Sequence, residues 1–173
     1  NSLLPYIDYD FLKTHPKKII GHSDVTAILL GVYQKTGITT FYGPNLMTCF
    51  GQMPPFLEYS LRSMEQTLSG NCPFRIEAPE FYSDELTKWG APLTPKQPIS
   101  NKWITVQSGI AEGRLIGGNL NTINGIMASP YMPDFREGDI LFLEDTEKFA
   151  AHSERYYSML KICGVFDKVS GIL

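Results

Sequence analysis

The sequence lacks the features that mark membrane proteins, nucleic-acid-binding proteins and disulfide-rich domains. No apolar run approaches the roughly 18 residues of a membrane-spanning helix, and no signal peptide opens the chain. Lys and Arg form no basic stripe and the net charge is −3, which argues against binding to a nucleic-acid polymer. Cys49, Cys72 and Cys163 form no CxxC pair, so neither a zinc site nor a disulfide framework is predicted. We expect a cytoplasmic protein that needs no cofactor or metal and binds no membrane.

The two ends of the sequence predict an internal fragment of a longer protein. Residue 1 is not Met, and residues 169–173 have the composition of a buried strand that stops in mid-run. A natural domain rarely ends inside a core strand, because the edge would stay unpaired.

Alternating strand and helix patterns predict an α/β fold. Gly37 and Gly164 are expected to end two of the helices as C-cap residues. Strands are expected at residues 17–21, 38–42, 103–107, 113–116, 139–143 and 169–173. Helices are expected at residues 24–35, 121–127 and 151–163, with another that opens at Pro54-Pro55 and ends before Gly70.

A proline-rich stretch without a helical period is expected to divide the chain. Residues 1–70 are predicted to form part of an N-terminal parallel-sheet lobe of flavodoxin or Rossmann type. Residues 71–100 are predicted to form a linker or substrate loop. Residues 101–173 are predicted to form part of a C-terminal α/β lobe with a mixed sheet.

Ser23 lies between an expected strand and an expected helix, in the sequence Gly21-His22-Ser23-Asp24. A serine at a sharp strand-to-helix turn can present its hydroxyl above the sheet edge. The backbone N–H groups and the positive end of the helix then lie close enough to stabilise an oxyanion. Serine is also a favoured N-cap residue, so the same residues suit a helix start without chemistry.

Glu144 follows an apolar strand, which places it at the carboxyl edge of the expected sheet, where α/β proteins carry site residues. There it could orient a histidine as the acid of a Ser-His-Glu triad. Alternatively, Asp145 and Glu147 are first-turn acids of the next helix and Lys148 is a solvated charge. Gly117-Gly118 suggests a close approach of the backbone, either to a ligand or to packing neighbours.

The sequence offers no suitable histidine for this chemistry. A serine is a poor nucleophile unless an adjacent base, usually a histidine, takes its proton. The sequence has three histidines. His15 precedes a proline, His152 begins a helix, and His22 is next to Ser23, where adjacent side chains usually point apart. None of them is a predicted catalytic base.

Five motifs, taken in order, resemble the LD-carboxypeptidase family of serine peptidases, also described as the muramoyltetrapeptide carboxypeptidase family. The resemblance covers essentially the whole chain, and it favours the catalytic interpretation of Ser23 and Glu144. The motifs are Leu3-Leu4-Pro5-Tyr6-Ile7-Asp8-Tyr9-Asp10, Gly21-His22-Ser23-Asp24-Val25-Thr26-Ala27 after Pro16-Lys17, Thr40-Phe41-Tyr42-Gly43-Pro44, Glu112-Gly113-Arg114-Leu115-Ile116-Gly117-Gly118-Asn119-Leu120 and Leu141-Phe142-Leu143-Glu144-Asp145.

The resemblance implies a Ser-His-Glu triad at the junction of two lobes, in a protein that forms a homodimer. Ser23 would be the nucleophile, Glu144 the triad acid, and the backbone N–H of Asp24 one oxyanion-hole donor. The family histidine is expected after Leu173 and the second oxyanion donor before Asn1. The 173-residue chain is therefore predicted to be inactive by itself. His22 departs from the family, which commonly has an aromatic such as Tyr there.

Two branches of the family give two substrates. The murein-recycling enzymes remove the terminal D-Ala of a tetrapeptide, whereas the microcin C self-immunity branch cuts the amide that joins an aspartyl residue to a modified nucleotide. The long proline-rich stretch resembles the immunity branch, in which Trp89 would stack on the base while Asn121 and Lys148 hold the aminoacyl part. Trp89 as a plain linker residue is the alternative. A non-catalytic module that binds an anion at the helix start is the alternative from another functional class.

Overall fold

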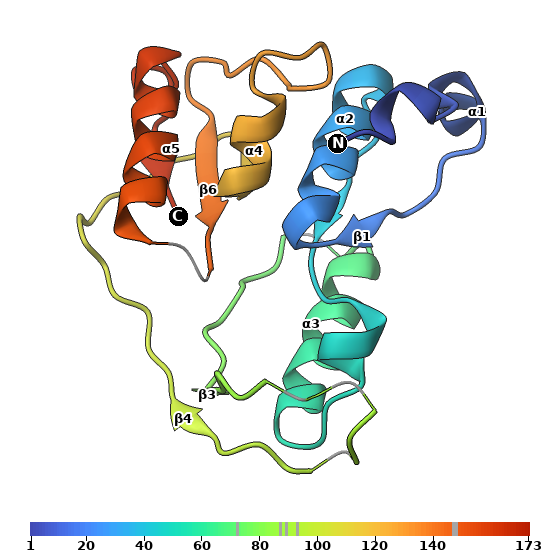
Figure 1. The fold of residues 1–173 in the computed structure, drawn as a ribbon, viewed down its shortest axis with the longest axis vertical. Coiled ribbons are helices and arrows are strands. Elements are labelled where there is room, and N and C mark those ends of the chain that lie inside the picture. Colours follow the sequence, from blue (N-terminus) through green and yellow to red (C-terminus); the bar gives the residue numbers. More distant parts are fainter. Residues whose placement is uncertain (72, 87, 89, 93, 147–148) are drawn as a thin grey trace. The chain divides into compact units, whose positions relative to one another are not determined.

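The computed structural model describes residues 1–71, 73–86, 88, 90–92, 94–146 and 149–173. These residues form two compact units (Figure 1). Unit 1 comprises Asn1–Tyr42 together with Gly109–Leu173, and unit 2 comprises Gly43–Ser108. Both ends of the chain therefore contribute to unit 1. The three-part division at residues 70 and 100 stays a prediction.

The first half of unit 1 is the expected strand–helix–strand segment. Strand β1 (Ile20–Gly21) pairs in parallel with β2 (Phe41–Tyr42). Between them, the short 3₁₀ turn η2 (Ser23–Val25) runs directly into α2 (Thr26–Thr36). Helix α2 ends at Gly37, whose φ of +75° and N–H bond to the carbonyl of Tyr33 confirm the predicted C-cap. Two short helices precede this segment, η1 (Leu4–Tyr6) and α1 (Tyr9–Thr14).

The second half of unit 1 is a three-stranded parallel sheet in the order β5-β6-β7. Its elements are β5 (Leu115–Asn119), α4 (Leu120–Ile126), β6 (Ile140–Glu144), α5 (Ala150–Ile162) and β7 (Gly171–Ile172). The register pairs Asn119 with Glu144, so both residues lie at the carboxyl ends of adjacent strands. The α/β fold class is confirmed. The three strands described here all run parallel, so an antiparallel strand of the expected mixed sheet is not among them.

One hydrophobic core joins the two halves of unit 1. Helix α4 packs against both α2 and α5 (Figure 1). Complete burial of a large aliphatic side chain stabilises a fold by about 1.5–3 kcal/mol, so the core residues supply most of the cohesion. The buried cluster consists of Leu4, Ala27, Leu30, Ile116, Leu120, Ile123, Ile126, Met132, Phe135, Leu141, Leu160 and Val165.

Arg114 also links the two halves, because it pairs with the buried Asp139 in the second half and bonds to Tyr33 in the first. Arg114 makes two hydrogen bonds to the carboxylate of Asp139, at 2.9 and 2.7 Å, and a third to the Tyr33 hydroxyl on α2 at 3.1 Å. Burial alone would raise the pKa of Asp139, but the bonds from Arg114 and the Arg136 backbone hold that pKa below its usual value. The hydrogen bonds to Asp139 and Tyr33 raise the pKa of Arg114.

Unit 2 contains η3 (Leu46–Phe50), α3 (Phe56–Leu68) and an antiparallel pair, β3 (Phe81–Tyr82) and β4 (Ile99–Ser100). None of its described residues is buried. The strand predicted at residues 103–107 is wrong. Its apolar side chains are mostly exposed, with Val106 at 98%, and these residues pair with no other described strand, although burial and pairing are what stabilise a strand. In the described part of the chain, no helix combines the length and apolarity needed to cross a membrane.

Candidate active site

Ser23 lies on a strained turn between β1 and α2. Its φ of +55° is in the left-handed region, which no other non-glycine residue in the described part of the chain adopts. This conformation costs an L-residue about 1–2 kcal/mol. A Cβ at Gly21 would lie 2.5 Å from Cγ1 of Val25, so the turn also needs glycine two residues earlier. The Ser23 residue is exposed, as the sequence predicts for a presented hydroxyl.

The N-cap interpretation of Ser23 does not fit this geometry. The cap position of η2 is His22, and no side chain caps the turn. An N-cap serine ordinarily has an extended backbone, whereas Ser23 is left-handed. The strain therefore has no capping bond to offset it.

Asp24 follows in the first turn, where backbone N–H groups have no intrahelical acceptor. Its carboxylate accepts a hydrogen bond from the Thr122 hydroxyl of α4 at 3.2 Å. The side chain is thus held at α4, which leaves the Asp24 N–H as a donor at the exposed turn.

Tyr42, at the end of β2, contacts both predicted triad members. Its hydroxyl accepts a hydrogen bond from the backbone N–H of Ser23 at 3.1 Å and donates one to Oε2 of Glu144 at 2.8 Å. The ring packs edge-on against Phe142, with centroids 5.3 Å apart. Burial and the neighbouring Glu144 raise the pKa of Tyr42 to about 12, so the phenol stays protonated at neutral pH.

Glu144 is half-buried at the end of β6. The side-chain amide of Asn119, its register partner on β5, donates to Oε2 at 2.9 Å. Both hydrogen bonds on this carboxylate fall on Oε2, and no donor among the described residues reaches Oε1. As far as the described residues go, the second oxygen is therefore available to accept an N–H group such as that of an imidazole.

A buried set of hydrogen bonds fixes Asn119 in turn. Its backbone N–H donates to Thr26 Oγ1 at 3.0 Å. Its side-chain oxygen caps α4 by accepting from the Thr122 N–H at 3.0 Å. The Thr122 hydroxyl has a single proton, which it shares between this oxygen at 3.0 Å and the Asp24 carboxylate at 3.2 Å. Thr26 is fully buried and Asn119 is 5% exposed. Satisfied polar groups in such a site hold a single geometry, because breaking one bond leaves a buried group unpaired.

The Gly117-Gly118 pair serves this packing rather than a ligand. A Cβ at Gly118, where φ is +140°, would lie 2.5 Å from Thr26 Cγ2. A Cβ at Gly117 would overlap the carbonyl oxygen of Phe142. Of the two interpretations that the sequence allows, close packing of β5 on α2 and β6 is the one that the contacts support.

The remaining predicted residues stand as follows. Asn121 is half-buried in the first turn of α4. Trp89 and Lys148 lie outside the described residues. His15 stacks on Phe11 and His152 lies against Phe149, and neither of these two described side chains hydrogen-bonds to Ser23 or Glu144.

Tyr42, Asn119 and Thr26 are the residues that sequence reasoning missed. The only sequence signal for Asn119 is its position at the end of a strand that neighbours the strand of Glu144. Tyr42 carries a similar signal, because it is the last residue of the strand predicted at residues 38–42.

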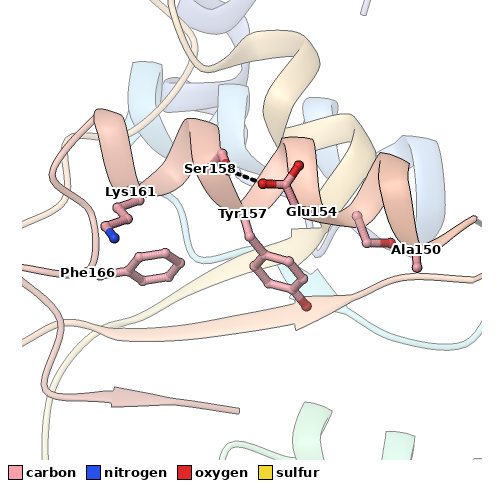
Figure 2. A pocket seen from close by; sticks show the side chains of 7 residues that line it. Ala150, Glu154, Tyr157, Ser158, Lys161 and Phe166 are labelled. Atoms are coloured by element: carbon pink, nitrogen blue, oxygen red, sulfur yellow. Dashed lines mark hydrogen bonds between the residues drawn. The ribbon is translucent and has the colours of Figure 1, made fainter.

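A shallow hollow of about 490 Å³ lies apart from these residues, on the surface of α5 (Figure 2). Its lining is mainly apolar, with the rings of Tyr157 and Phe166 beside Lys161. Glu154 on its rim accepts a hydrogen bond from Ser158 at 2.8 Å. None of the predicted site residues that the structure describes lines it.

Comparison with known proteins gives the following similarities. The model of the LD-carboxypeptidase N-terminal domain matches residues 1–43, and that of the C-terminal domain matches residues 112–173. The chain is 48% identical over 177 residues to the Microcin C7 self-immunity protein MccF of Escherichia coli, covering 100% of the chain and 52% of that protein. It is 45% identical over 174 residues to a putative carboxypeptidase of Vibrio cholerae, with the same coverage. The chain thus spans about half the length of these relatives.

Comparison with solved structures gives similarities to the same family. MccF in complex with aspartyl sulfamoyl adenosine matches with a TM-score of 0.91 at 48% identity, over 99% of this chain and 52% of that one. Other MccF structures include a tryptophan-to-phenylalanine mutant with adenosine monophosphate and an active-site mutant in which a serine, an asparagine and a lysine are replaced by alanine. A muramoyltetrapeptide carboxypeptidase from Oxalobacter formigenes matches with a TM-score of 0.71 at 25% identity, over 98% of this chain and 50% of that one.

Proposed function

The chain belongs to the LD-carboxypeptidase family of serine peptidases, and we propose that it supplies the nucleophile and the acid of a Ser-His-Glu triad. Ser23 is the nucleophile, Glu144 is the acid, and the histidine belongs to a segment that follows Leu173 in the full-length protein. One observation carries this assignment: a single hydroxyl, that of Tyr42, hydrogen-bonds to both the Ser23 backbone and the Glu144 carboxylate.

In this mechanism, the histidine takes the proton of Ser23 as its Oγ attacks the scissile carbonyl. Glu144 accepts the other imidazole N–H through Oε1, which fixes the tautomer and stabilises the imidazolium. The Asp24 N–H and the positive end of the η2–α2 segment stabilise the oxyanion, together with a second donor from upstream of Asn1. The histidine then protonates the leaving amine, and water hydrolyses the acyl-enzyme.

The proposed substrate is a microcin C-type conjugate, in which an amide joins an aspartyl residue to a nucleotide. The 48% identity to the self-immunity protein supports this choice over more distant members. The asparagine and lysine replaced in its active-site mutant are separated by the same number of residues as Asn121 and Lys148, which supports their role in holding the aminoacyl part. Trp89 stacks on the base, a contact worth about 1–3 kcal/mol. The protein acts as a homodimer.

The alternative function is removal of the terminal D-Ala from a murein tetrapeptide. It is favoured by the structural likeness to a muramoyltetrapeptide carboxypeptidase, which is weaker in identity than the likeness to MccF. The triad would be the same for both substrates, so the distinction depends on the residues around it. A non-catalytic anion-binding module would not require the left-handed backbone of Ser23, because helix starts bind anions in their ordinary conformation.

The test is a side-by-side assay of the full-length protein on an aspartyl-nucleotide amide and on murein tetrapeptide. We expect a higher kcat/KM for the aspartyl nucleotide. Ser23→Ala is expected to reduce turnover by about four to six orders of magnitude without unfolding the protein. Ser158→Ala is the matched control, because the partner of that hydroxyl among the described residues is Glu154 on α5.

Full activity of the Ser23→Ala protein would reject the proposed nucleophile. Ligand binding without hydrolysis of either substrate would favour the binding module. The 173-residue chain alone is expected to be inactive, and turnover by it would contradict the assignment of the base to a later segment.

A further inference from the structure

The two proposed triad residues belong to different sheets of unit 1. Ser23 follows β1 of the β1-β2 pair, whereas Glu144 ends β6 of the β5-β6-β7 sheet. Within the described residues, no strand ladder joins these sheets. Their alignment at the site therefore depends on side chains that cross from one sheet to the other.

Tyr42 makes such a crossing at the reacting groups themselves. It extends from β2 and bonds to Glu144 Oε2 at 2.8 Å while it accepts the Ser23 N–H at 3.1 Å. We propose that Tyr42 is a positioning residue that sets the separation between the nucleophile turn and the triad acid. This inference rests on the function proposed above.

The orientation of the carboxylate is the first quantity that Tyr42 controls. The terminal torsion of a glutamate is broad and gives little intrinsic preference. Two donors on the same oxygen, Tyr42 and Asn119, remove that freedom and direct Oε1 to its partner. Bonds to an ionised acceptor are about twice as strong as neutral ones, so the constraint is a firm one. With its pKa raised to about 12, Tyr42 keeps its proton and remains a donor across the working pH range.

The backbone conformation of Ser23 is the second quantity that Tyr42 controls. The turn holds a φ of +55° with no side-chain cap, and the hydrogen bond to Tyr42 gives its N–H an acceptor in that conformation. Loss of the hydroxyl would release the turn and the carboxylate together. Both changes lower the rate of the chemical step and leave substrate binding largely intact.

The test is Tyr42→Phe in the full-length protein, with Tyr33→Phe as the matched control. Tyr33 is also half-buried, and its hydroxyl also bonds to a charged partner, Arg114. Within the described residues, this hydroxyl makes no hydrogen bond to Ser23 or Glu144. We expect Tyr42→Phe to lower kcat roughly 10- to 100-fold with KM nearly unchanged, and Tyr33→Phe to alter neither. Rates are expressed per active site, titrated with a serine-directed covalent inhibitor, so that loss of folded protein cannot mimic the effect.

The pH profile gives a second readout that a purely structural role would not move. Removing one donor leaves more negative charge density on the Glu144 carboxylate, which stabilises the imidazolium and raises the pKa of the catalytic histidine. The ascending limb of kcat against pH should therefore move to higher pH in Tyr42→Phe. Conversely, 3-fluorotyrosine at position 42 retains both bonds with a more acidic hydroxyl, and should move the limb to lower pH. This second variant decides the question if Tyr42→Phe does not fold.

The outcomes separate the two proposals. A wild-type protein without turnover, or an active Ser23→Ala variant, refutes the proposed function. An active wild type with an inactive Ser23→Ala variant, but wild-type kcat and pH limb in Tyr42→Phe, refutes only the positioning role. Equal losses in Tyr42→Phe and Tyr33→Phe also refute it.

Discussion

Replacing Gly118 with alanine is expected to destabilise unit 1 by about 2–6 kcal/mol. The backbone contributes first, because a φ of +140° costs an L-residue about 1–3 kcal/mol. The new Cβ would also lie 2.5 Å from Cγ2 and 2.8 Å from Oγ1 of Thr26, a fully buried residue. Overpacking of this kind costs about 1–3 kcal/mol.

The matched control is Gly37→Ala. Gly37 also has a positive φ, +75°, but a Cβ there would meet nothing within 4 Å. Its substitution should cost only the backbone strain of about 1–2 kcal/mol. Adding Thr26→Ser to Gly118→Ala removes the methyl group that the new Cβ meets and keeps Oγ1, so it should restore part of the loss.

Hydrogen exchange measured by mass spectrometry on peptides from β5 and α2 is the suitable assay. Tryptophan fluorescence would not report on unit 1, because Trp89 and Trp103 both lie in residues 43–108. Faster exchange in Gly118→Ala than in Gly37→Ala is the expected result. Equal destabilisation by the two substitutions would refute the close-packing argument, and so would the absence of any rescue by Thr26→Ser.

Two further predictions concern stability. Asp139→Asn should destabilise the fold by about 3–5 kcal/mol because it leaves the Arg114 charge unpaired, whereas Asp134→Asn, where Arg114 bonds only to the backbone carbonyl, should have little effect in denaturant unfolding. The pKa of Asp139 is lowered in the folded protein. Its ion pair therefore stabilises the fold fully at pH values above the unfolded-state pKa of about 3.9, and this stabilisation is lost as the pH falls through the folded-state pKa. A pH series of the wild type and Asp139→Asn would show the loss. Ser23→Gly should be more stable than Ser23→Ala by about 1 kcal/mol, because glycine relieves the +55° φ at a smaller entropic cost. Equal melting temperatures for the two Ser23 variants would show that the turn is not strained.

Local patterns predicted much of the fold. The apolar run before Glu144 identified the central strand, and Gly37 identified the end of α2, because each signal depends on a few neighbouring residues. The strand expected at residues 103–107 failed for the converse reason: alternating apolar residues form a strand only when a partner covers them, and these are exposed.

The contacts of the site were harder to predict. Tyr42 and Glu144 are separated by 102 positions, and their bond depends on how two sheets meet. Asn119 becomes a partner of Glu144 only once the parallel register is known. The family resemblance identified Ser23 and Glu144 as candidate triad residues, but it gave no account of what holds them together.

The split composition of unit 1 has a consequence for how the chain folds. Leu4, Ala27 and Leu30 share their core with Ile116, Leu120 and Leu141, so the complete burial of this cluster requires β5 and β6 to be present. Contacts of such long range slow folding and leave apolar surface exposed during translation. The hydrogen bond from Tyr42 to Glu144, at the end of β6, can therefore form only after the second sheet has been synthesised.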